Sequence, residues 1–205
     1  MYTRAIMHLD SMGVSMGVSG FVFLAIIVVA LIYLIMLFNG LVSLKNNVKE
    51  AWANIDVLLK QRHDELPKLI ETCKQYMGYE KDTLEKVMQA RAGVQQARES
   101  GDMAALGPAE AQMRSMIGKL YAVAEAYPQL KANESFQELQ ARISGLENGI
   151  ADRREFYNDS VNLYNTRIQQ FPDLIIANNL GFKAANLLEF GEEEKKDVDV
   201  KALFG

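Results

Sequence analysis

Hydrophobic and polar residues follow two different patterns along this chain. Residues 21–38 read FVFLAIIVVALIYLIMLF, with no charged residue and no proline. A helix rises about 1.5 Å per residue, so about 20 such residues cross the hydrocarbon core of a bilayer. The run is longer than the apolar part of a usual signal peptide, and no small-x-small cleavage pattern follows it. We therefore predict a retained transmembrane helix over residues 21–43, after a Met- and Gly-rich lead-in over residues 1–20.

Beyond residue 43, apolar residues recur at intervals of three and four, which is typical of amphipathic helices. The pattern predicts an all-α fold, in which the transmembrane helix is followed by an elongated antiparallel bundle over residues 44–190. We expect three long helices and a short fourth: one that continues from the anchor to near Arg98, with Pro67 as a kink or a break, then residues 109–127, 133–171 and 173–190. Residues 191–205 are charge-rich, and we expect a mobile tail.

The third predicted helix has the most regular pattern in the chain. Large apolar residues stand seven apart at Phe136, Ile143, Ile150, Tyr157, Tyr164 and Phe171, with Leu139, Leu146, Val161 and Ile168 between them. Such a heptad seam predicts coiled-coil packing against other long helices. The pattern leaves open whether those helices belong to the same subunit or to another one.

Polar and small residues at helical spacing are the candidate sites. The pair Tyr157-Asn158 recurs as Tyr164-Asn165, and Gly13 with Gly17 forms a small-xxx-small pair that lets membrane helices approach closely. The polar groups either form a paired network inside one subunit or fix the register of subunits in a homo-oligomer. The candidates for packing and oligomerisation are Gly13, Gly17, Asn39, Trp52, Glu147, Arg154, Tyr157, Asn158, Tyr164 and Asn165.

Composition excludes several kinds of chemistry. The net charge is −4 and no basic run is present, so we expect no nucleic-acid binding. The single cysteine, Cys73, cannot form an intramolecular disulfide, and the two histidines, His8 and His63, lack partners at metal-ligand spacing. We predict no catalytic, cofactor-binding or metal-binding residue and no small-molecule substrate.

Several segments carry a family resemblance. They are FNGLVSLKNNVKEAWANIDVLLKQRHDELPKLIETCKQYMGYE (38–80), QAR (89–91), EAYPQLKANESFQELQ (125–140), ENGIADRREFYNDSVNLYN (147–165), FP (171–172) and GF (181–182). With them the chain resembles the LemA family of bacterial membrane proteins, although Lys68 stands where that family usually has Asn. The resemblance implies a helical bundle behind an N-terminal membrane helix, no known reaction or cofactor, and partners among membrane proteins and proteases.

Two functions are compatible with these features, and a third is less favoured. The first is a non-enzymatic, membrane-anchored scaffold that self-assembles into a homo-oligomer through its seams and its membrane segment. The alternative is an adaptor whose bundle and acidic tail bind another membrane protein, such as a protease. The third is a hydrolase that uses His63 and nearby carboxylates. Lys45 and Lys49 follow the apolar run, so we expect the bacterial inner membrane, with the N-terminus outside and the bundle in the cytoplasm.

Overall fold

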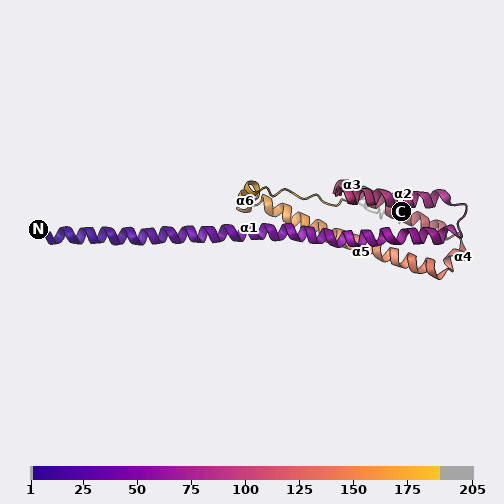
Figure 1. Cartoon of the computed structure of the whole chain (residues 1–205), viewed down its shortest axis with the longest axis horizontal. Coiled ribbons are helices and arrows are strands. Elements are labelled where there is room, and N and C mark those ends of the chain that lie inside the picture. The colour runs from indigo at the N-terminus through magenta and orange to yellow at the C-terminus, as the bar shows by residue number, and fades with distance from the viewer. Residues whose placement is uncertain (1, 190–205) are drawn as a thin grey trace, which may run out of the picture. The chain divides into compact units, whose positions relative to one another are not determined.

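The computed structural model describes residues 2–189, with side chains described from residue 17 (Figure 1). These residues form six helices and no strand, which confirms the predicted all-α class. The helices are α1 (Tyr2–Lys74), α2 (Lys81–Ser100), α3 (Met103–Ala124), α4 (Pro128–Lys131), α5 (Glu134–Gln169) and α6 (Asp173–Leu180). The lead-in residue Gly13 lies outside the described side chains, and the predicted tail, residues 191–205, lies outside the described residues.

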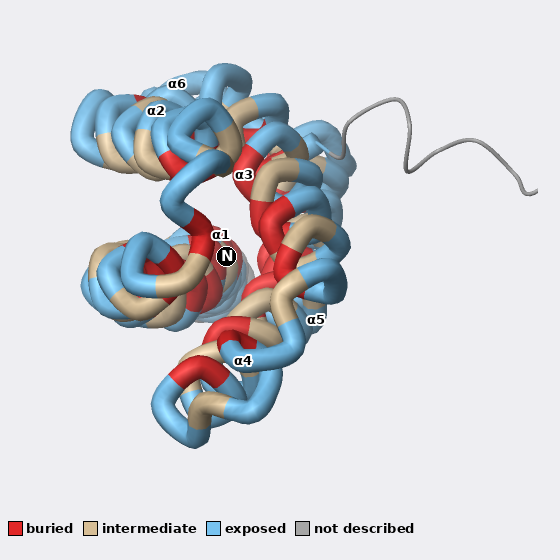
Figure 2. The backbone as a smooth tube through the Cα atoms, turned by 90° about the vertical axis from the view of Figure 1, so that its right-hand side faces the viewer, coloured by how far each residue is buried: buried red, intermediate tan, exposed pale blue. Residues whose placement is uncertain are grey.

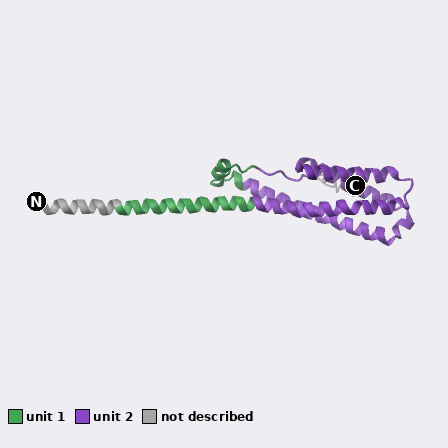
Figure 3. Ribbon diagram, viewed as in Figure 1, with its two compact units in different colours: residues 1–44, 167–183 green, residues 45–166, 184–205 purple. Residues whose placement is uncertain are grey.

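The chain divides into two compact units, and both α1 and α5 contribute residues to each (Figure 3). Unit 1 comprises residues 1–44 and 167–183, and unit 2 comprises residues 45–166 and 184–205. The boundaries predicted from the sequence, at residues 20, 43 and 190, stay predictions.

Unit 2 is a bundle built from α2, α3, α4 and the parts of α1 and α5 that lie within it. Apolar residues spaced three and four apart give each long helix one apolar face, and Figure 2 shows the buried positions on the inner sides of these helices. In α1 this face continues through Ile55, Leu59, Leu66 and Leu69, all nearly inaccessible to solvent. The seam of α5 is buried in the same core at Phe136, Ile143, Ile150, Tyr157 and Tyr164. These five positions are therefore covered by contacts within one chain.

The expectation of one long helix that ends near Arg98 is wrong. The helix α1 passes through Pro67 and ends at Lys74, and a turn over residues 75–80 leads into α2. Backbone bonds from Tyr76 N and Met77 N to the carbonyl of Cys73 close the last turn of α1. Two helices that fold back on each other bury both apolar faces, whereas one continuous helix would leave its second half without a partner.

Two other predicted boundaries also differ from the structure. Helix α3 begins at Met103 rather than near residue 109, because the Asp102 carboxylate caps it by accepting bonds from Ala104 N (3.0 Å) and Ala105 N (3.2 Å). The last predicted helix, residues 173–190, ends at Leu180. Gly181 follows it with φ of +72°, a left-handed conformation that ends the helix, and residues 182–189 are extended or irregular.

Unit 1 contains the apolar part of α1 together with α6. Every residue from 17 to 36 is exposed, and by length and composition α1 is the one helix among the described residues able to cross a membrane. The aromatic rings of Phe38 and Phe182 meet edge to face, with centroids 6.1 Å apart. Phe171, the last position of the predicted seam, is 80% exposed and lies beyond the end of α5.

Candidate functional site

A cluster of charged side chains is buried at the centre of unit 2. Arg62 of α1 is 2% exposed and donates from Nη2 to Glu110 Oε1 of α3 and from Nη1 to Glu147 Oε1 of α5, each at 2.5 Å. Arg114 Nε lies 3.9 Å from Glu147 Oε2, and the buried Arg154 lines the same small space. The guanidinium of Arg62 thus links three helices.

Electrostatics keep Arg62 charged in this position. Burial works to lower the pKa of Arg62, but the carboxylates of Glu110 and Glu147 outweigh it and hold that pKa above its ordinary value. The cavity beside the cluster has a volume of only about 10 Å³, which leaves no room for a ligand. The cluster therefore connects α1, α3 and α5 through buried ion pairs, and we expect these pairs to hold the three helices in register.

The repeated Tyr-Asn pair of α5 holds an extended segment, residues 184–189, which we call the strap. The Asn165 amide donates to Ala185 O and accepts from Ala185 N, both at 2.9 Å. The Asn158 amide makes the same pair of bonds to Leu188, at 3.0 and 2.9 Å. Tyr157 Oη donates to Asn186 O at 2.9 Å. Each asparagine thus pairs with strap backbone as a neighbouring strand would.

The spacing of the two asparagines matches the geometry of the strap. Seven residues of helix rise about 10.5 Å. Three residues of extended chain span about 10 Å. Asn165 and Asn158 therefore reach Ala185 and Leu188, and the strap runs antiparallel to α5. The heptad repeat of the Tyr-Asn pair is explained by this match.

A glycine of α3 receives the end of the strap. A Cβ added to Gly107 would stand 2.4 Å from the Glu189 carbonyl oxygen, which is closer than real Cβ atoms approach oxygen. Only glycine allows the strap backbone to lie this close to α3. Leu188, the preceding strap residue, is almost completely buried.

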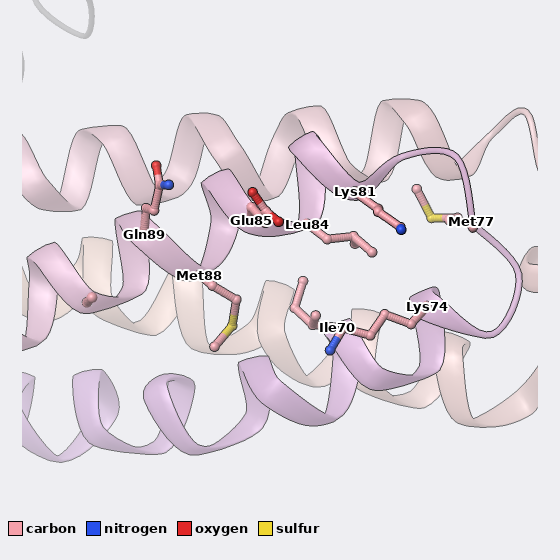
Figure 4. A pocket seen from close by; sticks show the side chains of 10 residues that line it. Ile70, Lys74, Met77, Lys81, Leu84, Glu85, Met88 and Gln89 are labelled. Atoms are coloured by element: carbon pink, nitrogen blue, oxygen red, sulfur yellow. The ribbon is translucent and has the colours of Figure 1, made fainter.

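A groove opens between the C-terminal part of α1 and the start of α2 (Figure 4). Its volume is about 690 Å³, within the range of small-molecule and peptide sites. The apolar lining residues are Ile70, Met77, Leu84, Met88 and Ala92, and the polar ones include Lys74, Lys81, Glu85 and Gln89. Met77 is fully buried, whereas Met88 is half-buried and can adapt to the shape of a partner. The two lysines against one glutamate make the rim slightly positive.

His63 is held by an arginine rather than by a carboxylate. Arg91 Nη2 lies 2.5 Å from His63 Nε2, and Arg91 Nε donates to the His63 carbonyl at 2.9 Å. Burial and the Arg91 charge both lower the pKa of His63. Among the described residues no group of three His, Cys, Asp or Glu side chains could hold a metal ion. Cys73 is fully buried, and burial raises the pKa of its thiol to about 12.

The structure brings most of the predicted candidates together in unit 2. Trp52 packs edge to face on Tyr157 with ring centroids 6.1 Å apart. Glu147 and Arg154 belong to the charge cluster, Tyr157, Asn158 and Asn165 bind the strap, and Tyr164 is buried in the core. Gly17 and Asn39 lie on the exposed surface of unit 1. That these residues set the register of an oligomer stays a prediction.

Sequence reasoning missed Arg62, Glu110, Gly107 and the strap. A signal for the first two was present, because Arg62 falls between Leu59 and Leu66 at apolar helical spacing, and Glu110 between Leu106 and Met113. Charged residues at such positions must find partners inside the core. Gly107 and the strap gave no signal, since their pairing depends on segments far apart in the sequence.

Comparison with known proteins gives one family and a few relatives. The model of the LemA family matches residues 51–202. Protein LemA of Metamycoplasma hominis is 28% identical over 167 residues, which cover 80% of this chain and 74% of that protein. Magnetosome protein MamQ 2 of Paramagnetospirillum magneticum is 33% identical over 43% of this chain and 32% of that protein. Magnetosome protein MamQ of Magnetospirillum gryphiswaldense is 23% identical over 73% of this chain and 64% of that protein.

Proposed function

We propose that this chain, which belongs to the LemA family, is a membrane-anchored helical scaffold that binds another protein through the groove between α1 and α2. The family resemblance predicted from the sequence is confirmed by the match over residues 51–202. The observation that carries the proposal is the double role of α1. One helix supplies both an uncharged run long enough to cross a bilayer and one wall of an open apolar groove.

The exposure of the apolar run supports the membrane anchor. Large side chains such as Phe21, Phe23 and Val29 are more than half exposed, and a surface of this kind is unfavourable in water but not among lipid chains. We place the anchor in the bacterial inner membrane. Because Lys45 and Lys49 follow the run, we place the N-terminus outside and the bundle in the cytoplasm.

The groove suits an amphipathic helix of a partner protein. Its floor is apolar, as in grooves that receive the apolar face of a helix, and its rim carries the two lysines Lys74 and Lys81. We expect the partner segment to carry acidic residues beside its apolar face. We propose no enzymatic role, and neither LemA nor MamQ is the name of an enzyme.

Site-specific photocrosslinking in the native membrane tests this function. A photoreactive amino acid replaces Lys81, which lines the groove, or Lys86, which is exposed on the same helix but lies outside the groove. We expect a discrete adduct with a second protein from position 81 and none from position 86. The added substitution Met88→Glu puts a carboxylate into the apolar floor, so it should remove the adduct, whereas Lys86→Glu should leave it.

Equal adducts from positions 81 and 86, or an adduct that survives Met88→Glu, would reject the groove as the binding site. An adduct between two copies of the chain would instead identify the groove as a self-association surface. The charged tail, residues 191–205, remains the other predicted contact with a membrane partner such as a protease, and its deletion should leave the position-81 adduct unchanged if the groove alone binds.

Self-assembly into a homo-oligomer is the second candidate function. The five buried seam positions of α5 are filled within the chain, so assembly would use the membrane segment instead. Gly17 supports this route, because a Cβ there meets nothing within 4 Å and a second helix has space to approach. The particle mass of the full-length chain in mild detergent should then exceed one copy and fall to one copy when Gly13 and Gly17 are both replaced by Leu.

A further inference from the structure

In unit 1, α6 lies beside the last turns of the apolar run of α1. Leu31, Ile35 and Phe38 of α1 and Ile175 and Leu180 of α6 line one shallow apolar hollow of about 410 Å³. The edge-to-face contact of Phe38 with Phe182 adds a second connection, just beyond the end of α6. These contacts place α6 at the same level as residues 31–38 along α1.

Several apolar side chains in and beside α6 are exposed, including two that line the hollow. Ile175 is 54% exposed and Leu180 is 59% exposed, and the preceding Phe171 is 80% exposed. The asparagines between them, Asn178 and Asn179, carry no charge, and the Asn179 amide is already bonded to the Ile175 carbonyl at 2.7 Å. Large apolar side chains that are exposed close together favour contact with an apolar partner.

The distribution of charge on α6 matches that on α1. No charged residue occurs from Leu174 to Phe182, and none occurs on α1 from residue 21 to residue 44. The acidic residue at the start of α6, Asp173, is buried and pairs with Arg167 Nε at 3.0 Å, so its charge does not reach the outer surface. Two adjacent uncharged elements thus share one apolar surface.

We propose that Phe171 and α6 form a membrane-interface element that inserts its apolar side chains between the lipids beside the anchor. The occupant of the hollow is then a lipid acyl chain. The Asn179 amide that lines the hollow is already bonded within α6, and the exposed Asn178 lies at the level of the head groups. Transfer of exposed apolar side chains from water to lipid is favourable, and it can take place at this boundary without a charged face. The inference rests on the proposed membrane anchor. It adds a second contact with the bilayer, in the leaflet that surrounds residues 31–38 of α1.

Depth-dependent fluorescence quenching tests the proposal in the full-length chain. A single cysteine replaces Ile175, Ala30 in the middle of the apolar run, or Tyr79, which is 99% exposed in unit 2. Each is labelled with an environment-sensitive dye. Cys73 can stay, since it is fully buried. The proteins are reconstituted into vesicles of phosphatidylcholine and phosphatidylglycerol that contain lipids spin-labelled near the head group or deep in the chain.

We expect the dye at position 175 to be quenched most by the shallow spin label, the dye at position 30 by the deep one, and the dye at position 79 by neither. A second cysteine variant, Leu180→Cys, should repeat the behaviour of position 175 and guards against a local effect of one label. If position 30 is quenched but positions 175 and 180 behave like position 79, the inference is wrong while the anchor stands. If position 30 is not quenched either, the anchor itself is wrong.

One further outcome would also overturn the inference. A dye at position 175 that is shielded from water but not quenched by lipid would indicate that protein covers α6. Disulfide formation between two copies of the Ile175→Cys variant in the same vesicles would then identify a second copy as the occupant.

Discussion

The two units use similar apolar residues in opposite ways. In unit 2, the apolar positions of α2, α3 and the seam of α5 are buried against one another, and the charged residues among them are paired. In unit 1, the side chains of residues 17–36 of α1 and those of Leu174, Ile175 and Leu180 of α6 are exposed, whereas Leu37, Leu41, Ile176 and Ala177 are buried. Apolar content alone therefore does not distinguish a core from a lipid-facing surface. The difference is the pattern, because unit 2 repeats its apolar residues at intervals of three and four whereas residues 21–38 are apolar on every side.

Polar residues sharpen the same contrast. A charged or amide side chain inside a bundle must be paired, so it specifies which helix faces go together. Arg62 does so for α1, α3 and α5, and Asn158 and Asn165 do so for α5 and the strap. In unit 1, the buried Asp173 pairs with Arg167, whose side chain is 45% exposed.

The largest expected effect comes from removing the central charge of unit 2. Arg62→Met leaves the buried carboxylate of Glu110 without its partner, so we expect a loss of about 3–5 kcal/mol in the free energy of unfolding. Urea unfolding in mild detergent, followed by the fluorescence of the single tryptophan, Trp52, measures this loss. The same substitution at Arg153, which is exposed, should change stability by less than about 0.5 kcal/mol.

A double substitution tests whether the loss at Arg62→Met comes from the unpaired carboxylate of Glu110. Adding Glu110→Leu to Arg62→Met removes the unpaired carboxylate, so the double variant should be more stable than Arg62→Met alone. The losses of unfolding free energy of Arg62→Met and Glu110→Leu are also measured singly. If the loss of the double variant equals their sum, Glu110 and Arg62 are not coupled and the cluster does not hold the helices in register.

The strap should respond to a single methyl group. Gly107→Ala forces the Glu189 carbonyl to move, and we expect a loss of about 1–3 kcal/mol as strap bonds weaken. Hydrogen exchange at the amides of Ala185 and Leu188, which bond to Asn165 and Asn158, should become faster.

The same substitution elsewhere on α3 gives the control. Gly118 is exposed, and a Cβ there meets nothing within 4 Å, so Gly118→Ala should stabilise α3 by about 0.5–1 kcal/mol. Equal effects at positions 107 and 118 would mean that the strap does not depend on its close approach to α3.

The sequence predicted helix type and core phase better than helix ends. The heptad seam placed five buried residues of α5 correctly because burial on one helix face repeats at fixed intervals. The seam prediction was wrong at Phe171, since α5 ends two residues earlier. The apolar pattern of the first helix did not indicate the turn at residues 75–80, where Gly78 is the only helix-breaking residue. The roles of Asn158 and Asn165 depend on strap residues that lie 30 and 20 positions later in the sequence, respectively, so no local pattern indicates them.

Stability should also fall at mildly acidic pH because of His63. Its pKa is lowered in the folded state by burial and by Arg91, so the unfolded chain takes up the proton first as pH falls. The stability of the bundle should therefore decrease as pH falls from about 6.5 and level off below the folded pKa of His63. His63→Gln should flatten this part of the curve of unfolding free energy against pH. An unchanged slope would assign the titration to another group.

The smallest expected change in stability is at Phe171, which shares its heptad phase with the buried Phe136. Phe136 is 2% exposed in the core of unit 2, so Phe136→Ala should cost about 3–5 kcal/mol in urea unfolding of the bundle. Phe171 stands at the same phase of the repeat but is 80% exposed in unit 1, so Phe171→Ala should change that free energy by less than about 0.5 kcal/mol. Similar losses for both would mean that residue 171 is part of the bundle core. The contrast between buried apolar residues in unit 2 and exposed ones in unit 1 would then not hold at residue 171.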